Sequence, residues 1–409
     1  MRIGIVLLLM LLLDIYVYQV VRYLSAGQTD WLKWIWRGSF WVSSALALIL
    51  AFCILQGYAE KWPKNLLTYT RTFLFIFYFS KLFFAVFILI DDLRRLGSKA
   101  YQLIAGTEPF SPTRSKFLTN TALFVGFLPF TSLLYGIIRN PYRYKIYTTK
   151  IKMPEIKLGN QSLRIVQISD IHAGSFTFKE PVKLAIDMIN DLKPDLVFFT
   201  GDLVNNKAEE MIPFIEIFQQ IKSKYGVYST LGNHDYGDYA KWDSSEEKEQ
   251  NLQQLKDIHR TLGWDLLMNE NRILDIGGKK IAVIGVENYS AILRFPRHGD
   301  LSKAYQGTEE ADIKLLLTHD PSHWDAQVRT EYKDIDLTFS GHTHGFQFGI
   351  EIPGVFSWSP SQYVYKQWAG IYKKENQYLY VNRGLGFLGY PGRVGILPEI
   401  TSIDLDTAI

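Results

Sequence analysis

The sequence has little cysteine and no large excess of charge of either sign. Its single cysteine, Cys53, cannot form an intrachain disulfide and cannot build a Cys-based zinc site. The 44 Lys and Arg residues nearly balance the 41 Asp and Glu residues, which leaves a formal net charge of +3. So balanced a charge argues against nucleic acid as a partner. The chain also shows no internal repeat and no low-complexity tract.

Long apolar runs, in contrast, crowd into the first third of the 409 residues. Four runs each approach the ~20 residues that a helix needs to cross the hydrocarbon layer of a membrane. They are residues 3–21, 40–57, 73–90 and 117–138. Tryptophans cluster around the start of the second run, and indole rings favour the membrane interface. We therefore expect residues 1–140 to form a transmembrane domain of four helical spans; a signal peptide is the alternative interpretation of the first run.

Two charged residues, Asp14 and Lys81, lie inside the first and third runs. A charge within a bilayer is costly unless it is paired or its side chain extends to the interface. We expect the two residues to pair across helices, with separate extension to the interface as the alternative. The Lys and Arg residues that flank the runs divide eight against eight between the two sides, so the positive-inside rule gives no orientation.

The composition changes after residue 138, where a basic and aromatic segment follows the last apolar run. We interpret residues 141–157 as a juxtamembrane linker that can lie on anionic headgroups. An edge strand in solvent is the alternative interpretation. The remaining residues, 158–409, are then expected to form a separate domain.

Short apolar runs alternate with helical patterns in this last part of the chain. The runs indicate six buried strands, at residues 163–168, 196–200, 227–230, 281–285, 314–318 and 337–339. Helical spacing is found at residues 181–192, 211–221 and 246–262. This succession of strands and helices indicates an α/β layered fold.

Side chains of the kind that bind metals follow five of the six strands, near the point where each strand ends. In chain order they are Asp170 and His172, then Asp202, then Asn233, His234 and Asp235, then His319, then His342 and His344. The carboxyl ends of strands are where open α/β sheets build their sites. Carboxylate, imidazole and amide oxygen ligands suit divalent first-row ions such as Mn, Fe and Zn. A structural zinc does not need so many ligands, whereas two ions about 3.5–4 Å apart form a clamp for displacement at phosphorus.

The order and spacing of these clusters resemble the calcineurin-like metallophosphoesterase superfamily over about residues 158–405. The matching motifs are Asp-Ile-His at 170–172, Gly-Asp-Leu-Val at 201–204, Gly-Asn-His-Asp at 232–235, a lone His319, and Gly-His-Thr-His at 341–344. The resemblance implies the metallo-dependent phosphatase fold, a four-layer α/β/β/α sandwich of two mixed sheets. Here that domain is expected to follow an α-helical membrane domain.

The same resemblance implies a role for each motif residue. Two sets of three residues would each hold one divalent ion: Asp170, His172 and His344 for the first ion, and Asn233, His319 and His342 for the second. Asp202 would bridge the two ions. His234 would contact the phosphate or protonate the leaving oxygen as a general acid. Asp235 would orient His234, or it would only cap the local turn.

Two further stretches resemble the membrane-associated branch, the transmembrane proteins with a metallophosphoesterase domain. They are His-Asp-Pro at 319–321 followed by Trp324 and Asp325, and Asn-Arg-Gly-Leu-Gly at 382–386 followed by Pro391, Arg393 and Pro-Glu-Ile at 398–400. The resemblance implies a phosphodiester or pyrophosphate substrate near the membrane. A lipid-linked one such as UDP-2,3-diacylglucosamine is among the substrates implied. We expect an integral protein of the cell (inner) membrane with the catalytic domain on the cytoplasmic side.

Three arginines are candidates for contact with the substrate: Arg294, Arg383 and Arg393. A solvated loop is the alternative role for Arg294, and a salt bridge at the edge of the core is the alternative for the other two. Two other functions compete with hydrolysis of a lipid-linked substrate. One is a tethered hydrolase of soluble phosphoesters, and the other is a metal-binding membrane sensor without turnover. The intact His234 argues against the sensor, because a protein that only binds has no need of a general acid.

Overall fold

The computed structural model of the chain describes residues 2–106, 116–153, 162–352 and 354–407. The chain divides into two compact units, Met1–Tyr135 and Gly136–Ile409. The division falls inside the fourth long helix, so that the last residues of this helix belong to the second unit.

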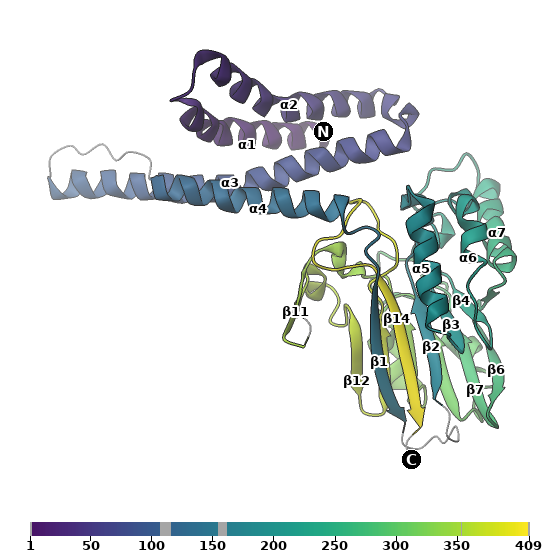
Figure 1. The fold of residues 1–409 in the computed structure, drawn as a ribbon. Coiled ribbons are helices and arrows are strands. Elements are labelled where there is room, and N and C mark those ends of the chain that lie inside the picture. The colour runs from purple at the N-terminus through teal and green to yellow at the C-terminus, as the bar shows by residue number, and fades with distance from the viewer. Residues whose placement is uncertain (1, 107–115, 154–161, 353, 408–409) are drawn as a thin grey trace. The chain divides into compact units, whose positions relative to one another are not determined.

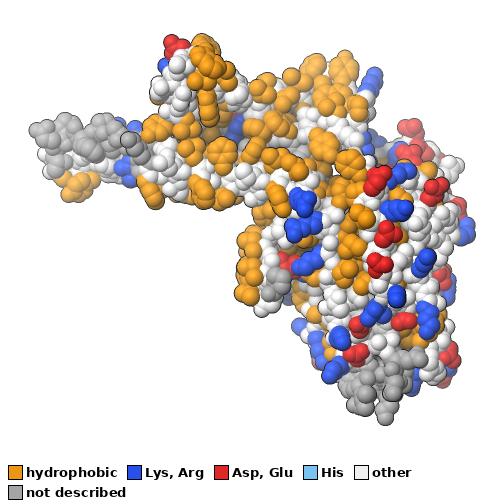
Figure 2. Space-filling model, in the orientation of Figure 1, with side chains coloured by type: hydrophobic (Ala, Val, Ile, Leu, Met, Phe, Trp, Pro, Cys, Tyr) orange, Lys and Arg blue, Asp and Glu red, His pale blue; other side chains and the backbone are white. Residues whose placement is uncertain are grey.

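Four long helices dominate the first unit (Figure 1). They are α1 (Arg2–Ser25), α2 (Asp30–Leu55), α3 (Lys64–Ala105) and α4 (Lys116–Ile138). Each is long and apolar enough to cross a membrane, which confirms the four predicted spans by length and composition. Figure 2 shows hydrophobic side chains over much of the visible surface of these helices, as expected for a protein that faces lipid. The 42 residues of α3 extend about 60 Å, well beyond the predicted run.

The two charges inside the predicted spans meet in this bundle. Lys81 Nζ of α3 lies 2.5 Å from Asp14 Oδ1 of α1, and both side chains are buried. The predicted pairing across helices is therefore confirmed.

Two six-stranded sheets form the framework of the second unit. The first sheet contains, from edge to edge, β1 (Lys145–Met153), β14 (Glu399–Thr407), β2 (Leu163–Ile168), β3 (Leu196–Thr200), β4 (Val227–Thr230) and β5 (Asp265–Leu266). The second contains β12 (Gly370–Lys374), β13 (Gln377–Val381), β9 (Leu337–Ser340), β8 (Ile313–Leu317), β7 (Lys279–Gly285) and β6 (Glu270–Ile276). Both sheets are mixed, because parallel central strands are joined by antiparallel ones. A separate hairpin consists of β10 (Ile350–Ile352) and β11 (Phe356–Trp358).

The two sheets pack face to face, with helices on both outer faces. Phe198 of the first sheet and Phe339 of the second share one buried cluster. On the outer face of the first sheet lie α5 (Lys179–Asp191), α6 (Ile215–Phe218) and α7 (Ser245–Thr261), which bury their apolar sides against it. On the outer face of the second sheet lie α8 (Leu301–Tyr305) and the segment before α9 (Arg329–Glu331). The expected α/β/β/α sandwich of two mixed sheets is therefore confirmed.

Residues 145–153 of the predicted linker differ from the expectation. They form β1, which runs parallel to β14 along nine residue pairs. The edge-strand interpretation therefore describes this part of the segment, because its alternating side chains complete the rim of the first sheet. Residues 154–157 of the predicted linker lie outside the described residues.

The predicted helix at residues 211–221 was wrong in its type and length. A 3₁₀ turn covers Ala208–Phe214, and only Ile215–Phe218 are α-helical. Pro213 supplies the reason, since it has no N–H to continue an α-helical hydrogen-bond ladder. The other two predicted helices are confirmed as α5 and α7, and the six predicted strands as β2, β3, β4, β7, β8 and β9.

Candidate active site

The predicted ligands leave the strand ends on strained turns. Among the described residues, five of them have positive φ angles: Asp170, His172, Asp202, His342 and His344, between 46° and 70°. L-residues seldom adopt this left-handed region, and such strain persists only where the surrounding structure enforces it. The strands β2, β3 and β9 thus end in sharp turns that direct these side chains to one edge of the two sheets.

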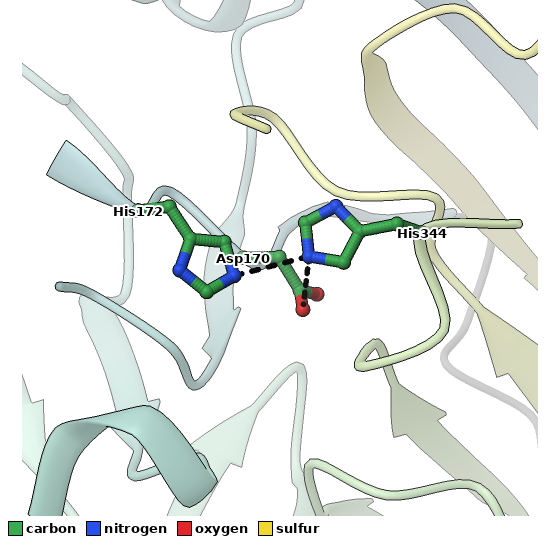
Figure 3. A group of neighbouring side chains, drawn as sticks. All are labelled: Asp170, His172 and His344. Atoms are coloured by element: carbon green, nitrogen blue, oxygen red, sulfur yellow. Dashed lines mark hydrogen bonds and ion pairs between the residues drawn. The ribbon is translucent and has the colours of Figure 1, made fainter. Parts of the chain in front are cut away.

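One group of possible ligands consists of Asp170, His172 and His344 (Figure 3). Their side chains converge from the turns after β2 and β9. His344 Nε2 lies 3.1 Å from Asp170 Oδ1 and 3.0 Å from His172 Nε2. Two imidazole nitrogens at this distance repel each other through their lone pairs unless a proton or a cation lies between them. The group therefore fits a divalent ion.

The second group consists of Asp202, His319 and His342. His319 Nε2 lies 3.1 Å from Asp202 Oδ2 and 3.2 Å from His342 Nδ1. The same Asp202 oxygen lies 3.6 Å from His172 Nε2 of the first group. Asp202 therefore stands between the two groups, where a carboxylate can share its oxygens.

Asn233 adds an oxygen to this constellation. Its side chain is buried, and its Nδ2 donates a hydrogen bond to the hydroxyl of Tyr239 over 2.9 Å. Within the part of the chain that the structure describes, its Oδ1 has no hydrogen-bond partner. A buried amide oxygen without a donor is costly, so this atom fits coordination of a cation.

The electrostatics of the buried groups favour a cation. Burial lowers the pKa of His172 to about 3, which keeps this imidazole neutral and able to ligate. Burial acts in the same direction on His319, but the nearby Asp202 and Asp170 carboxylates together outweigh it and raise the pKa of His319 to about 10. Burial opposes ionisation of Asp202, yet neighbouring histidines hold its pKa well below the usual value. The site therefore contains anionic carboxylates whose negative charge a bound cation would balance.

Two glycines give the ligands room. A Cβ on Gly341 would lie 2.0 Å from Ser169 Oγ and 2.2 Å from Asp170 Oδ2. A Cβ on Gly232 would lie 2.2 Å from Asp202 Oδ1. Because real Cβ atoms do not approach other atoms so closely, any larger residue at either position would displace a ligand.

His234 faces this centre, and its neighbours fix its tautomer. Its Nδ1 lies 2.7 Å from the carbonyl oxygen of Asn205. A carbonyl only accepts, so Nδ1 carries the hydrogen and Nε2 is left for the pocket.

The structure corrects the expectation that Asp235 orients His234. The Asp235 carboxylate accepts hydrogen bonds from the backbone N–H groups of Asp202, Leu203, Val204 and Gly232. It is buried beneath the turn that carries Asp202, and the Asn205 carbonyl holds the His234 ring instead. Asp235 therefore shapes the loop of the candidate bridging ligand, as its turn-capping alternative anticipated.

A pocket of about 340 Å³ opens over both ligand groups. Its polar floor includes His172, Asp202, Asn233 and His234. Its walls contain residues that the sequence did not single out: Phe295, Thr343, Phe346, Gln347, Tyr365, Leu388 and Tyr390. The one sequence feature that could have indicated these wall residues is the presence of aromatic residues shortly after a ligand motif. Aromatic residues are equally common in hydrophobic cores, so this feature does not identify a pocket.

Among the three candidate arginines, only Arg294 lines the pocket, with its guanidinium 4.6 Å from the ring of Phe295. Arg383 is buried and pairs with Glu399 over 2.6 Å and with Glu351 over 2.5 Å. Arg393 is also buried, and it donates to the carbonyl oxygens of Arg383, Gly384 and Gly386. The expectation that Arg383 and Arg393 contact substrate is corrected, because neither lines the pocket and both guanidinium groups bond to partners inside the fold.

Comparison with known proteins follows the same division of the chain. Residues 1–141 match the family model described as probable calcineurin-like phosphoesterase, transmembrane domain. Residues 163–346 match the family model of calcineurin-like phosphoesterase. Among solved structures, that of the protein TT1561 from Thermus thermophilus is similar with a TM-score of 0.34 and 11% identity, over 57% of this chain and 91% of that chain.

Individual relatives agree with the family models. YkuE of Bacillus subtilis, named an uncharacterized metallophosphoesterase, is 31% identical over 277 residues, which cover 66% of this chain and 89% of that protein. The transmembrane protein with metallophosphoesterase domain of Danio rerio is 29% identical over 283 residues, or 67% of this chain. The chain spans 60% of the length of that relative and of its Bos taurus counterpart. The chain is therefore a membrane-spanning member of the calcineurin-like metallophosphoesterase family.

Proposed function

We propose that this chain hydrolyses a phosphodiester or a pyrophosphate with the help of two divalent metal ions. The observation that carries the proposal is the position of Asp202 Oδ2, 3.6 Å from His172 Nε2 and 3.1 Å from His319 Nε2. This carboxylate stands between two separate groups of ligands, which is the arrangement that a pair of neighbouring ions requires.

Each ion would have its own ligands. Asp170, His172 and His344 would hold the first, and Asn233, His319 and His342 would hold the second, with Asp202 shared. Mn, Fe and Zn all suit this mixture of imidazole and oxygen ligands. When bound, a pair of divalent ions polarises the phosphoryl oxygens and eases deprotonation of water.

His234 would supply the proton that the reaction needs. Hydrolysis forms a bond from a water oxygen to phosphorus and breaks the bond from phosphorus to the ester oxygen. In its protonated form, His234 would give the departing oxygen the proton on Nε2, while Nδ1 stays hydrogen-bonded to the Asn205 carbonyl. Arg294 would contact the phosphate from the pocket wall.

The substrate would be near the membrane and lipid-linked, with UDP-2,3-diacylglucosamine as one candidate. Apolar pocket residues such as Phe346 and Leu388 support a substrate with a hydrophobic part, and the four spans keep the enzyme at a bilayer. In this proposal residues 1–140 anchor the protein and residues 158–409, with β1, carry the chemistry. A tethered hydrolase of soluble phosphoesters, and a sensor that binds metal without turnover, are the competing proposals.

The test uses the full chain in detergent, because β1 precedes residue 158 and belongs to the catalytic sheet. Bis-p-nitrophenyl phosphate is the substrate, and Mn²⁺, Fe²⁺ and Zn²⁺ are added in turn. We expect metal-dependent release of p-nitrophenolate that is abolished in Asp202→Asn. His234→Ala should lose about 100-fold or more with diphenyl phosphate, whose leaving oxygen needs a proton, and less with the p-nitrophenyl ester, whose leaving group departs as the anion. His323→Ala is the matched control, since His323 is bonded to Thr318 and Gln327. Two bound ions per chain without turnover would reject the hydrolase in favour of the sensor.

A further inference from the structure

The β10–β11 hairpin exposes hydrophobic side chains instead of burying them. Val355 is 79% exposed and Tyr363, which follows the hairpin, is 77% exposed. Ile350, Ile352 and Phe356 are each about half exposed. We call these five residues the hairpin surface. Figure 2 shows hydrophobic side chains gathered where Figure 1 labels β11. Contiguous apolar surface of this kind marks an interaction site.

The hairpin is held to the protein by its other side. Glu351 alternates with Ile350 and Ile352 along β10, so it points the opposite way. There its carboxylate pairs with Arg383 and accepts a hydrogen bond from the hydroxyl of Tyr147, both over 2.5 Å. The apolar side chains are thus presented outward from a fixed base, which is the arrangement of a docking element.

The base of the hairpin adjoins the pocket. Phe346 and Gln347 line the pocket, and β10 begins three residues after them. The chain between them is fixed by two backbone hydrogen bonds, from Val394 N–H to the Gln347 carbonyl and from Gly349 N–H to the Val394 carbonyl. Whatever binds the hairpin surface is therefore held beside the pocket mouth.

The segment that fixes the hairpin base is also hydrogen-bonded to the end of the fourth long helix, α4. The Arg393 N–H donates to the Gly136 carbonyl over 3.1 Å, and Asn140 Nδ2 donates to the Arg393 carbonyl over 2.8 Å. Gly136 lies in the last turn of α4, which has the length and apolar composition of a membrane span. The loop that carries the pocket residues Leu388 and Tyr390 is thus tied to the last turn of a helix with the length and composition of a membrane span.

We propose that the hairpin surface inserts into the bilayer that anchors the chain, and that the pocket beside it takes the phosphoester headgroup of a lipid from that bilayer. The second half of this proposal rests on the proposed hydrolase function. The bilayer is the occupant because the chain's own last span ends against the loop that fixes the hairpin base. Apolar side chains at the interface then gain by leaving water, and the lipid headgroup reaches the pocket without leaving its membrane.

The first test measures the depth of the hairpin without any substrate. The full chain carries Cys53→Ser and either Ile352→Cys or Phe356→Cys, and is spin-labelled in nanodiscs of phosphatidylethanolamine and phosphatidylglycerol. We expect the label to collide with lipid-soluble oxygen at least three times more readily than with a water-soluble nickel chelate. Ile273→Cys is the matched control, because Ile273 is 44% exposed on β6, at the edge of the second sheet. Preference for nickel at both hairpin positions would overturn the insertion, and so would spin–spin broadening that assigns the surface to a second copy.

The second test compares two substrates with the same scissile bond, hexadecyl and methyl p-nitrophenyl phosphate. In both, water adds at phosphorus and p-nitrophenolate leaves. We expect Ile352→Lys/Phe356→Glu, whose opposite charges preserve the cross-strand pair, to lose at least tenfold in kcat/KM for the hexadecyl ester in vesicles. The methyl ester should change less than twofold, and Ile273→Lys should change neither. Equal rates on both esters in wild type would overturn the lipid preference and leave the hydrolase standing. Failure to cleave either ester would instead reject the hydrolase, while the spin-label result still decides the insertion.

Discussion

The Lys81 ammonium lies 2.5 Å from the Asp14 carboxylate and links α3 to α1 inside the helix bundle. The hydroxyl groups of Ser44 and Tyr78 donate to the other Asp14 oxygen, and Lys81 also donates to Ser43. Every charged atom of the pair is thus hydrogen-bonded, which is how a buried ion pair becomes tolerable in an apolar medium.

Removal of one partner should therefore cost more than removal of both. We expect Asp14→Asn or Lys81→Met alone to destabilise the chain by about 3–5 kcal/mol, because each leaves a buried charge without its partner. The double variant should recover at least half of the lost thermal midpoint in detergent. A double variant that loses the sum of the two single losses would show that the charges act independently.

The glycine beneath Asp170 offers a sharp test of the site geometry. In Gly341→Ala the new methyl group would meet Ser169 Oγ and Asp170 Oδ2, so the carboxylate must move. We expect about 100-fold lower phosphodiester turnover, since a displacement of an ångström at a catalytic centre has that effect. Gly97→Ala is the control, because a Cβ there meets none of the described residues within 4 Å. Turnover within threefold of wild type in Gly341→Ala would contradict the described ligand positions.

Substitutions of Arg294 and Arg383 should affect different properties, substrate binding at Arg294 and stability at Arg383. Arg294→Ala should raise KM about tenfold with little change in thermal midpoint, since the side chain lines the pocket. Arg383→Ala should destabilise the chain by about 3–5 kcal/mol, because it leaves the buried Glu399 carboxylate unpaired. Steady-state kinetics and thermal unfolding of both variants check this. A raised KM in Arg383→Ala, together with a lowered thermal midpoint in Arg294→Ala, would instead indicate that Arg383 contacts the substrate.

His259 should make stability depend on pH in a defined direction. Burial lowers its pKa to about 3, whereas an exposed histidine has a pKa of about 6.5. Between these pH values the unfolded chain therefore binds a proton at His259 that the folded chain does not bind. The contribution of His259 to the free energy of unfolding is complete above pH 6.5 and falls as pH drops toward 3. At pH 5 this titration lowers the free energy of unfolding by about 2 kcal/mol.

A variant isolates this contribution from that of the other histidines. Between pH 7.5 and pH 5, the thermal midpoint of wild type should fall further than that of His259→Gln, which keeps a partner for Ser229 but has no titrating group. Equal falls in the two proteins would mean that His259 binds its proton at the same pH in the folded and the unfolded chain.

Local pattern was enough to place the candidate ligands at strand ends but did not identify the residues that support them. β3 is buried on both faces, so its sequence is a continuous apolar run with Asp202 just beyond its end. By contrast, Arg383 looks the same in sequence whether it faces a phosphate or Glu399. Its partner Glu351 is 32 residues away and reaches it only because of the hairpin. The role of Asp235 was ambiguous for the same reason, since a carboxylate serves equally well beside an imidazole or under a turn.

The strand β1 shows a related limit. Lys145–Met153 contains three lysines and few apolar residues, and as an edge strand it pairs with the sheet only through β14. Nothing local distinguishes such a strand from a linker, and its pairing partner lies more than 250 residues further along the chain. The hairpin β10–β11 was missed because each of its strands has only three residues, too few for an alternating pattern to stand out.

The left-handed turns under Asp170, His172, Asp202, His342 and His344 have a consequence for handling the protein. Their conformational cost is met by the folding of the two sheets, so the ligands stand ready before any ion arrives. An unfolded chain with the same side chains would have to impose five unfavourable backbone conformations at once, and would hold metal far more weakly. The metal content of a purified sample should therefore serve as a gauge of how much of it is correctly folded.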